Sequence, residues 1–201
     1  DVEVRLCGSV TDIEEMIDQA VWEHELGSWS ADDTCSEIKK RLKAGADKVV
    51  INSVAIDNPE FIKKAAEEFG SQCIVVSVDV KKTSMDKWNI FKYFGKNITD
   101  LNLTKWIEII QELGAGEILI QSIDRDGTSQ GYDLDLLKSI SKKITVPCII
   151  LGGAGNFDDF VKAHAINNEV SLAAANVFHF TEQSVLNAKK YMFKNKINVR
   201  V

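Results

Sequence analysis

Short apolar runs alternate with amphipathic segments along most of the chain. Six apolar runs have the length and composition of buried strands, and they start at about residues 2, 47, 73, 117, 147 and 170. Apolar residues at helical spacing follow these runs over residues 38–44, 59–69, 103–113, 134–141, 157–165 and 182–193. This alternation predicts parallel βαβ units. Polar residues gather only at the carboxyl ends of the strands, which favours a TIM-type barrel.

The amino-terminal region fits this pattern less well. Residues 2–6 alternate as a strand would, and Thr11 with Glu14 forms the capping box of a predicted helix. Residues 22–34 are polar and contain tryptophan, which indicates a loop before helical spacing resumes at Ile38. Six strands are fewer than the eight of a closed barrel.

The composition indicates one compact intracellular domain. The chain has 201 residues, 45% of them hydrophobic, which is enough to bury a core but short of the ~250 residues of a complete TIM barrel. No apolar run approaches the ~20 residues of a membrane span, and no signal peptide is visible, so we expect a cytoplasmic protein without a membrane partner. A net charge of -6 disfavours nucleic acid as a partner but does not exclude a phosphorylated substrate.

Neither the cysteines nor the histidines form a pattern that indicates a chemical centre. Cys73 and Cys148 lie inside predicted strands, and the four cysteines show no CxxC spacing, so we expect inert core residues rather than disulfides. His24 and His164 have no clustered ligands around them, and His179 is expected to pack in a loop. We therefore expect no metal site and no cofactor.

The segment from Gly114 to Asp133 joins a predicted buried strand to an acidic loop and a helix start. Asp124, Asp126 and Gly127 follow the carboxyl end of that strand, where βα-barrel enzymes keep their chemistry. Asp133 directly precedes the apolar residues of the next helix and is its predicted N-cap. The two loop aspartates are candidate functional groups, although a loop closed by Asx turns has the same composition.

A glycine-rich turn follows the strand at residues 146–151. Five small residues stand at the ends of two neighbouring strands: Gly152, Gly153, Gly155, Ala174 and Ala175. The glycines lack side chains where backbone amides would approach an anion at a helix N-terminus. Together with Gly127 these positions predict a phosphate site. Simple use of the glycines in tight turns is the alternative.

Five segments resemble, in the same order, the cyclase subunit of imidazole glycerol phosphate synthase. They are Gly45-Ala-Asp-Lys-Val-Val-Ile-Asn-Ser, Phe69-Gly-Ser-Gln-Cys-Ile-Val-Val-Ser-Val-Asp, Gly114-Ala-Gly-Glu-Ile-Leu-Ile-Gln-Ser-Ile-Asp-Arg-Asp-Gly-Thr, Gly152-Gly-Ala-Gly and Val177-Phe-His-Phe. The resemblance runs from about residue 38 to residue 200. It implies a (βα)8 TIM barrel and a lyase or cyclase activity in histidine biosynthesis. In that family a glutaminase partner releases ammonia, which crosses the barrel and attacks a phosphorylated ribulosyl-formimino aminoimidazole carboxamide nucleotide. The products are imidazole glycerol phosphate and the carboxamide ribotide.

The resemblance assigns roles to residues at the carboxyl ends of the strands. Asp79 matches the family's acid or base at the end of the fifth barrel strand, where ring closure and carbon–nitrogen cleavage both need proton transfer. A simple loop cap is the alternative for this residue. Asp126 matches a substrate-contacting residue, and Gly127 leaves its amide open to a phosphate. Asn52 and Ser53 match the second phosphate site, in the other half of the barrel.

The resemblance also implies a gate for ammonia at the opposite mouth of the barrel. Lys48 and Glu117 match members of a charged ring at the strand amino ends, and Asp47 matches a residue that faces the glutaminase. Ion pairs that merely stabilise the bottom of the barrel are the alternative.

Several departures from the family pattern modify these expectations. The family's catalytic aspartate at the end of the first strand has no match, and residues 2–10 align best with the third strand. Gln121 stands where the cyclase has a small hydroxyl residue. We therefore expect residues 1–201 to form a single partial barrel domain that lacks the first two βα units and carries an insertion at about residues 22–34.

Three readings remain open for such a chain. It is a synthase subunit that uses ammonia in histidine biosynthesis, or a paralogue that aminates a sugar in surface-polysaccharide biosynthesis, toward which residues 77–82 and Leu151 lean. The third reading is a non-catalytic barrel fragment that binds phosphate ligands or a glutaminase. Open sheet edges in a partial barrel also predict self-association.

Overall fold

The computed structural model describes residues 2–3, 31–84, 87–93, 95–179 and 184–199. Its strands form one mixed sheet in the order β1-β2-β3-β6-β7-β8, with β4 beside β3 and β5 beside β4. Strands β2, β3, β6, β7 and β8 run parallel. The strands are β1 (Val2–Glu3), β2 (Val49–Ile51), β3 (Ile74–Ser84), β4 (Lys87–Lys92), β5 (Asn97–Ile98), β6 (Glu117–Ser122), β7 (Cys148–Leu151) and β8 (Ser171–Ala173).

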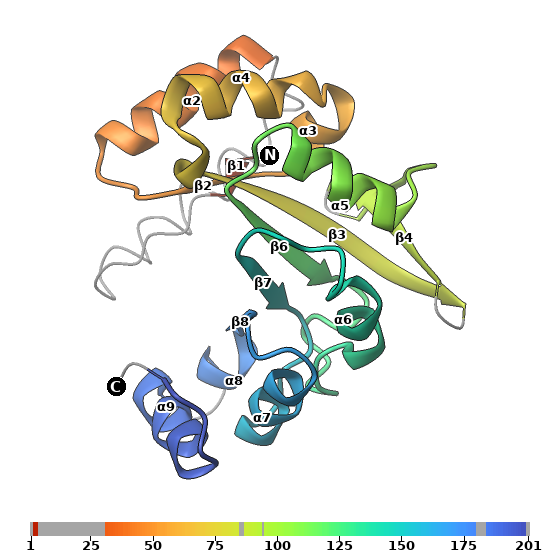
Figure 1. Ribbon diagram of the computed structural model, residues 1–201, viewed down its shortest axis with the longest axis vertical. Coiled ribbons are helices and arrows are strands. Elements are labelled where there is room, and N and C mark those ends of the chain that lie inside the picture. The colour runs from red at the N-terminus through yellow and green to blue at the C-terminus, as the bar shows by residue number, and fades with distance from the viewer. Residues whose placement is uncertain (1, 4–30, 85–86, 94, 180–183, 200–201) are drawn as a thin grey trace.

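Helices connect the parallel strands and lie on the outer side of the curved sheet (Figure 1). They are α2 (Ala31–Lys43), α3 (Ser53–Asp57), α4 (Glu60–Phe69), the 3-10 turn η1 (Ser71–Cys73), α5 (Leu103–Glu112), α6 (Leu134–Ile140), α7 (Phe157–Ile166), α8 (Asn176–His179) and α9 (Val185–Lys194). The predicted alternation of strands and helices is confirmed over residues 38–179.

Five local predictions need correction. Helix α2 already begins at Ala31, so the last four residues of the predicted loop at 22–34 are helical. Residues 2–3 pair antiparallel with β2 rather than parallel to it. Cys73 ends the η1 turn instead of lying inside a strand. His179 is the last residue of helix α8 instead of lying in a loop. Helices α3 and α8 were not predicted, because each spans only a single turn or little more. The capping box at Thr11 lies outside the described residues.

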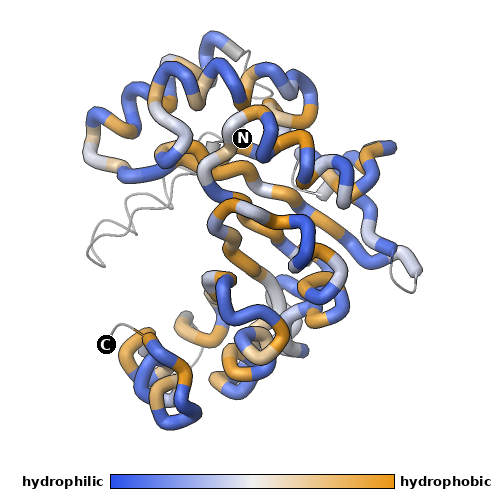
Figure 2. The backbone as a smooth tube through the Cα atoms, in the orientation of Figure 1, coloured by the Kyte–Doolittle hydropathy of each residue, from blue (hydrophilic) through white to orange (hydrophobic). Residues whose placement is uncertain are grey.

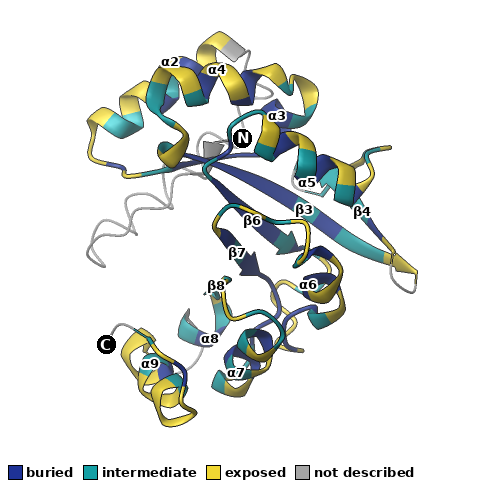
Figure 3. Cartoon of the chain, viewed as in Figure 1, coloured by how far each residue is buried: buried dark blue, intermediate teal, exposed yellow. Residues whose placement is uncertain are grey.

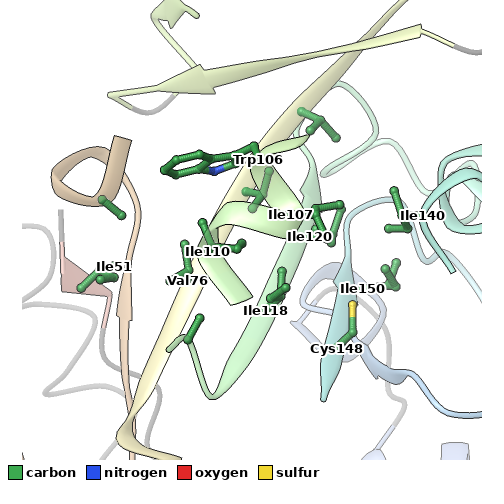
Figure 4. Packing of buried hydrophobic residues seen from close by; sticks show 14 of the residues in the cluster. Ile51, Val76, Trp106, Ile107, Ile110, Ile118, Ile120, Ile140, Cys148 and Ile150 are labelled. Carbon is green, nitrogen blue, oxygen red and sulfur yellow. The ribbon is translucent and has the colours of Figure 1, made fainter. Parts of the chain in front are cut away.

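The two faces of the sheet differ in what they contact. Side chains alternate along a strand, so Val49 and Ile51 face the helices while Val50 faces the inner, concave side. The helix-facing core joins strand residues to Trp106, Ile107 and Ile110 of α5 (Figure 4). Apolar residues concentrate in the strands and on the inward sides of the helices (Figure 2). The buried residues lie in the same places (Figure 3).

An arm of three antiparallel strands extends from the parallel sheet. Strand β3 continues past its parallel partners to Ser84, where β4 and then β5 add to it, in a region for which the sequence predicted no further strand. The buried indole of Trp88 donates a hydrogen bond from Nε1 to Oδ2 of Asp133, at 2.8 Å. Asp133 also accepts from the backbone amide of Leu136 at the start of α6, so the predicted N-cap is confirmed. One buried carboxylate therefore ties the arm to helix α6.

No helix in the described part of the chain is long and apolar enough to cross a membrane.

Candidate functional site

The strand register places Asp79 on the inner face of the sheet, at its carboxyl edge. Asp79 pairs with Gln121 of β6, and Gln121 pairs with Leu151 of β7, so the three side chains share one face. The half-buried carboxylate of Asp79 accepts a hydrogen bond from the hydroxyl of Ser77, two residues earlier, at 2.8 Å. Asp79 lies inside β3, five residues before its end, so the loop-cap alternative does not describe it.

Asn52 and Ser53 lie beside Asp79 on the other side of β3. Asn52 donates from Nδ2 to the backbone oxygen of Ser77 at 3.0 Å, which brings the end of β2 next to the residue that holds Asp79. Ser53 donates to Oδ1 of Asn52 at 3.2 Å and accepts from the backbone amide of Tyr93 at 2.9 Å. Both side chains are buried, and hydrogen bonds within the protein fix their orientation.

The loop after β6 holds the two aspartates in different ways. Asp124 accepts from the hydroxyl of Ser122 at 3.0 Å and from the amide of Lys82 at 3.1 Å, so it closes the loop against β3. Asp126 is exposed and accepts from Nε2 of Gln121 at 3.1 Å. Gln121 therefore stands between Asp79, its neighbour across the strands, and Asp126.

The glycines after β7 are packed against the loop after β6. A Cβ atom at Gly152 would come within 2.5 Å of the Ser122 carbonyl oxygen, and one at Gly153 within 2.3 Å of the Gly131 carbonyl oxygen. Both glycines also have φ near +100°, at 107° and 97°, where side chains are strained. This packing accounts for the glycines without a ligand. Phosphate binding there remains a prediction.

A carboxylate of helix α7 itself caps the backbone amides at the start of that helix. Asp159 accepts hydrogen bonds from the amides of Gly155 and Asn156 through Oδ2, at 3.0 and 3.2 Å, and the side chain of Asn156 completes the capping box. Asp159 is buried. These two amides are satisfied by the chain itself, so an anion at this edge would have to use others.

The predicted positions of the carboxyl-terminal half nevertheless come together. A Cβ atom at Gly127 would lie 3.6 Å from Nδ2 of Asn176, the first residue of α8. Ala174 is half-buried and Ala175 exposed, and both directly precede that residue. Sequence reasoning missed Asn176, although its place right after two small residues at a strand end was a usable signal.

The predicted gate residues lie at the opposite edge of the sheet. Lys48, just before β2, forms an ion pair with Glu117 at the start of β6, with 2.7 Å between Nζ and Oε2. Glu117 is buried whereas the side chain of Lys48 is 45% exposed, and Asp47 is exposed. The pair lies close to Cys148. Burial, with a smaller contribution from the charge of Glu117, raises the pKa of the Cys148 thiol to about 12, so this cysteine stays protonated and unreactive near neutral pH.

Within the described residues, Cys35, Cys73 and Cys148 are free thiols. The same residues contain no group of three histidine, cysteine, aspartate or glutamate side chains that could hold a metal ion.

Residues 33–184 match the protein family described as histidine biosynthesis protein. The chain belongs to this family. Members fold as (βα)8 barrels, so the predicted fold class is confirmed, and the parallel strands with their crossover helices are a part of such a barrel.

Three relatives carry the name of one subunit of one enzyme. The chain is 44% identical over 168 residues to "Imidazole glycerol phosphate synthase subunit HisF" of Hydrogenobaculum sp. and 43% identical over 164 residues to the protein of that name of Streptococcus mutans. It is 45% identical over 168 residues to "Putative imidazole glycerol phosphate synthase subunit hisF2" of Vibrio vulnificus. These matches cover 84%, 82% and 84% of this chain, and 67%, 65% and 61% of the relatives. The chain thus spans about two thirds of the length of its HisF relatives.

Proposed function

We propose that the protein to which this chain belongs acts as the cyclase subunit of imidazole glycerol phosphate synthase. It uses ammonia from a glutaminase partner to convert the phosphorylated ribulosyl-formimino aminoimidazole carboxamide nucleotide into imidazole glycerol phosphate and the carboxamide ribotide. The observation that carries this proposal is the position of Asp79 on β3, between the predicted phosphate residues at the end of β2 and those after β6, β7 and β8. A ligand with a phosphate at each end would place its middle at that carboxylate.

Each group has a role that suits its chemistry. Asp79 transfers the proton in ring closure and in carbon–nitrogen cleavage, and Ser77 orients its carboxylate. Asn52 and Ser53 hold one phosphate. Backbone amides and small residues hold the other phosphate, with Asp126 in contact with the substrate. The residues of this second group are Asp126, Gly127, Gly152, Gly153, Ala174 and Ala175.

Ammonia would arrive from the opposite edge of the sheet. Lys48 and Glu117 close the amino ends of β2 and β6 with one ion pair, which a small neutral molecule can pass when the pair opens. Asp47 is exposed beside it and suits contact with the glutaminase. Partner and gate together deliver ammonia to the inner face, at whose far edge Asp79 lies.

An assay with the full-length protein tests the proposal. Ammonium salt and the histidine-pathway nucleotide are supplied without a glutaminase, and both products are followed chromatographically. Formation of both products, lost in Asp79→Asn, is the expected result. Tight binding of the nucleotide without turnover would support a non-catalytic barrel instead. The names of the three relatives do not favour the sugar-aminating alternative.

A further inference from the structure

Three loops at the carboxyl edge are joined by hydrogen bonds that the proposed chemistry does not use. The hydroxyl of Tyr132, in the loop after β6, donates to the carbonyl oxygen of Ala173 at the end of β8, at 2.9 Å. The amide of Gly131 donates to the carbonyl oxygen of Gly153 after β7, at 2.7 Å. Residues 131 and 132 therefore contact the chain at the carboxyl ends of both β7 and β8.

Arg125 holds this junction from within the same loop. Its Nη1 donates to the carbonyl oxygen of Gly131 at 3.2 Å and reaches that of Tyr132 at 3.5 Å. A Cβ atom at Gly153 would lie 3.1 Å from the Cβ atom of Arg125, so the stem of the arginine also packs on the glycine turn. Arg125 directs its charge at backbone carbonyl groups, which makes it a brace for the loop rather than a ligand for an anion.

The aromatic ring of Tyr132 packs in the hydrophobic core. It is buried at 3% exposure, and its ring stacks edge-on against Phe160 of α7 with 5.8 Å between centroids. Burial, with a smaller contribution from the charge of Asp159, raises the pKa of the Tyr132 hydroxyl. The hydroxyl therefore stays protonated and keeps donating at any pH used for an assay.

We propose that Tyr132 and Arg125 are positioning residues that fix the spacing of the three loops forming the carboxyl-terminal phosphate site. The inference rests on the proposed function, because it concerns that same site. Gly127, Gly153 and Ala175 belong to three separate loops, and backbone amides bind an anion well only when their relative positions are set beforehand. Neither positioning residue touches the phosphate itself.

Tyr132→Phe is the sharpest test, because it removes one oxygen atom and keeps the ring. The full-length protein is titrated calorimetrically with inorganic phosphate and with ribose 5-phosphate. We expect the Kd of both probes to rise roughly threefold to tenfold, which is the range for one lost hydrogen bond. In turnover, KM should rise with kcat nearly unchanged. Tyr191→Phe on α9 is the matched control and should leave the Kd of both probes unchanged.

Arg125→Lys separates bracing from charge. Lysine keeps the positive charge but lacks the planar fork that spans two carbonyl oxygens. We expect this variant to bind both probes more weakly, as Tyr132→Phe does. Unchanged affinity would overturn the positioning role of Arg125. Circular dichroism melting confirms that each variant is folded at the temperature of the titration.

The outcomes distinguish the two proposals. If the unmutated protein binds neither probe, the phosphate site of the proposed function fails, and this inference fails with it. If the unmutated protein binds and folded Tyr132→Phe binds equally well, the positioning role alone is overturned. A lower melting temperature with unchanged affinity would assign Tyr132 to stability only, and would likewise overturn it.

Discussion

At the scale of single residues, Asp79 is the group on which the proposed chemistry depends. Its carboxylate is half-buried, oriented by Ser77 and in register with Gln121. Asp79→Asn keeps the shape of the side chain but cannot transfer a proton. We expect turnover to fall by roughly 10²–10⁴-fold, with ligand affinity nearly intact. Steady-state kinetics and calorimetric titration of the same preparation measure the two quantities.

The control for this variant is Asp158→Asn. Asp158 is an exposed carboxylate on α7 that pairs with Lys162, and its loss should leave turnover unchanged. Activity of Asp79→Asn near the unmutated level would remove Asp79 from the reaction.

Gly127 offers a cleaner test of the phosphate site than Gly153 does. A side chain at Gly153 would collide with the backbone of residue 131, so any loss of binding there would follow from a displaced loop. Gly127 is exposed, and its added Cβ would meet nothing closer than 3.6 Å. Its φ of 76° is one that asparagine and aspartate tolerate better than other side chains.

The pair Gly127→Asp and Gly127→Asn therefore differs in charge and hardly in shape. We expect the aspartate variant to bind ribose 5-phosphate on the order of tenfold more weakly than the asparagine variant, because a like charge would stand beside the anion. Titrations at low and high salt should show the gap narrowing as salt screens the repulsion. Equal affinities would move the phosphate away from Gly127.

At the scale of elements, the arm formed by β3, β4 and β5 shows where sequence reasoning stops. Residues 87–92 carry apolar Trp88 and Ile90 in alternation, but the six-residue run is short and has lysine at both ends. What makes it a strand is tertiary: β3 supplies hydrogen bonds along one edge, and Asp133 receives the Trp88 indole from 45 residues away. Neither contact can be read from local periodicity.

The double role of Asp133 predicts a large loss of stability in Asp133→Ala. The substitution removes the cap of α6 and leaves the buried indole N–H of Trp88 without its acceptor. We expect the free energy of unfolding to fall by about 2–4 kcal/mol, as the sum of a lost cap and a buried unpaired donor. Urea denaturation followed by fluorescence measures it.

Asp135→Ala is the matched control, two residues further along the same helix. Asp135 is exposed and forms only a surface ion pair with Lys82, so its removal should hardly move the urea midpoint. Equal losses in the two variants would show that the buried hydrogen bonds of Asp133 contribute nothing special.

At the scale of the whole molecule, the alternation of strands and helices was predictable because the central parallel strands β2, β3 and β6 are buried on both faces. Continuous apolar runs such as residues 118–120 therefore stand out in the sequence. The gathering of the candidate site residues at one edge was also predictable, because the carboxyl ends of parallel strands meet at one edge of a sheet. The bonds between loops were not. Tyr132 and Arg125 bind backbone oxygens, which any sequence supplies, so no pattern of residue types marks their partners.

The described part of the sheet is open, and its last strand, β8, is a candidate edge for association. Among the described strands β8 pairs only with β7, so no described strand covers its other edge. Helix α9 packs on α7, which follows β7, and exposes Val185, Leu186 and Phe193, the last with 64% of its surface accessible. Exposed apolar side chains and an edge strand that no described strand covers both favour pairing with a second polypeptide.

The 201-residue chain expressed by itself should therefore associate at micromolar concentration. Size-exclusion chromatography with light scattering should give a mass above 22.4 kDa that falls on dilution. Replacing Leu186 and Phe193 together by glutamate should shift the chain toward the monomer, because the apolar contribution is lost while the fold stays intact on the buried side of α9 at Ala188. Glutamate at exposed Lys63 and Lys105, on α4 and α5, tests whether added negative charge alone has the same effect. A folded monomer at every concentration would mean that the edge of β8 and the surface of α9 do not drive association.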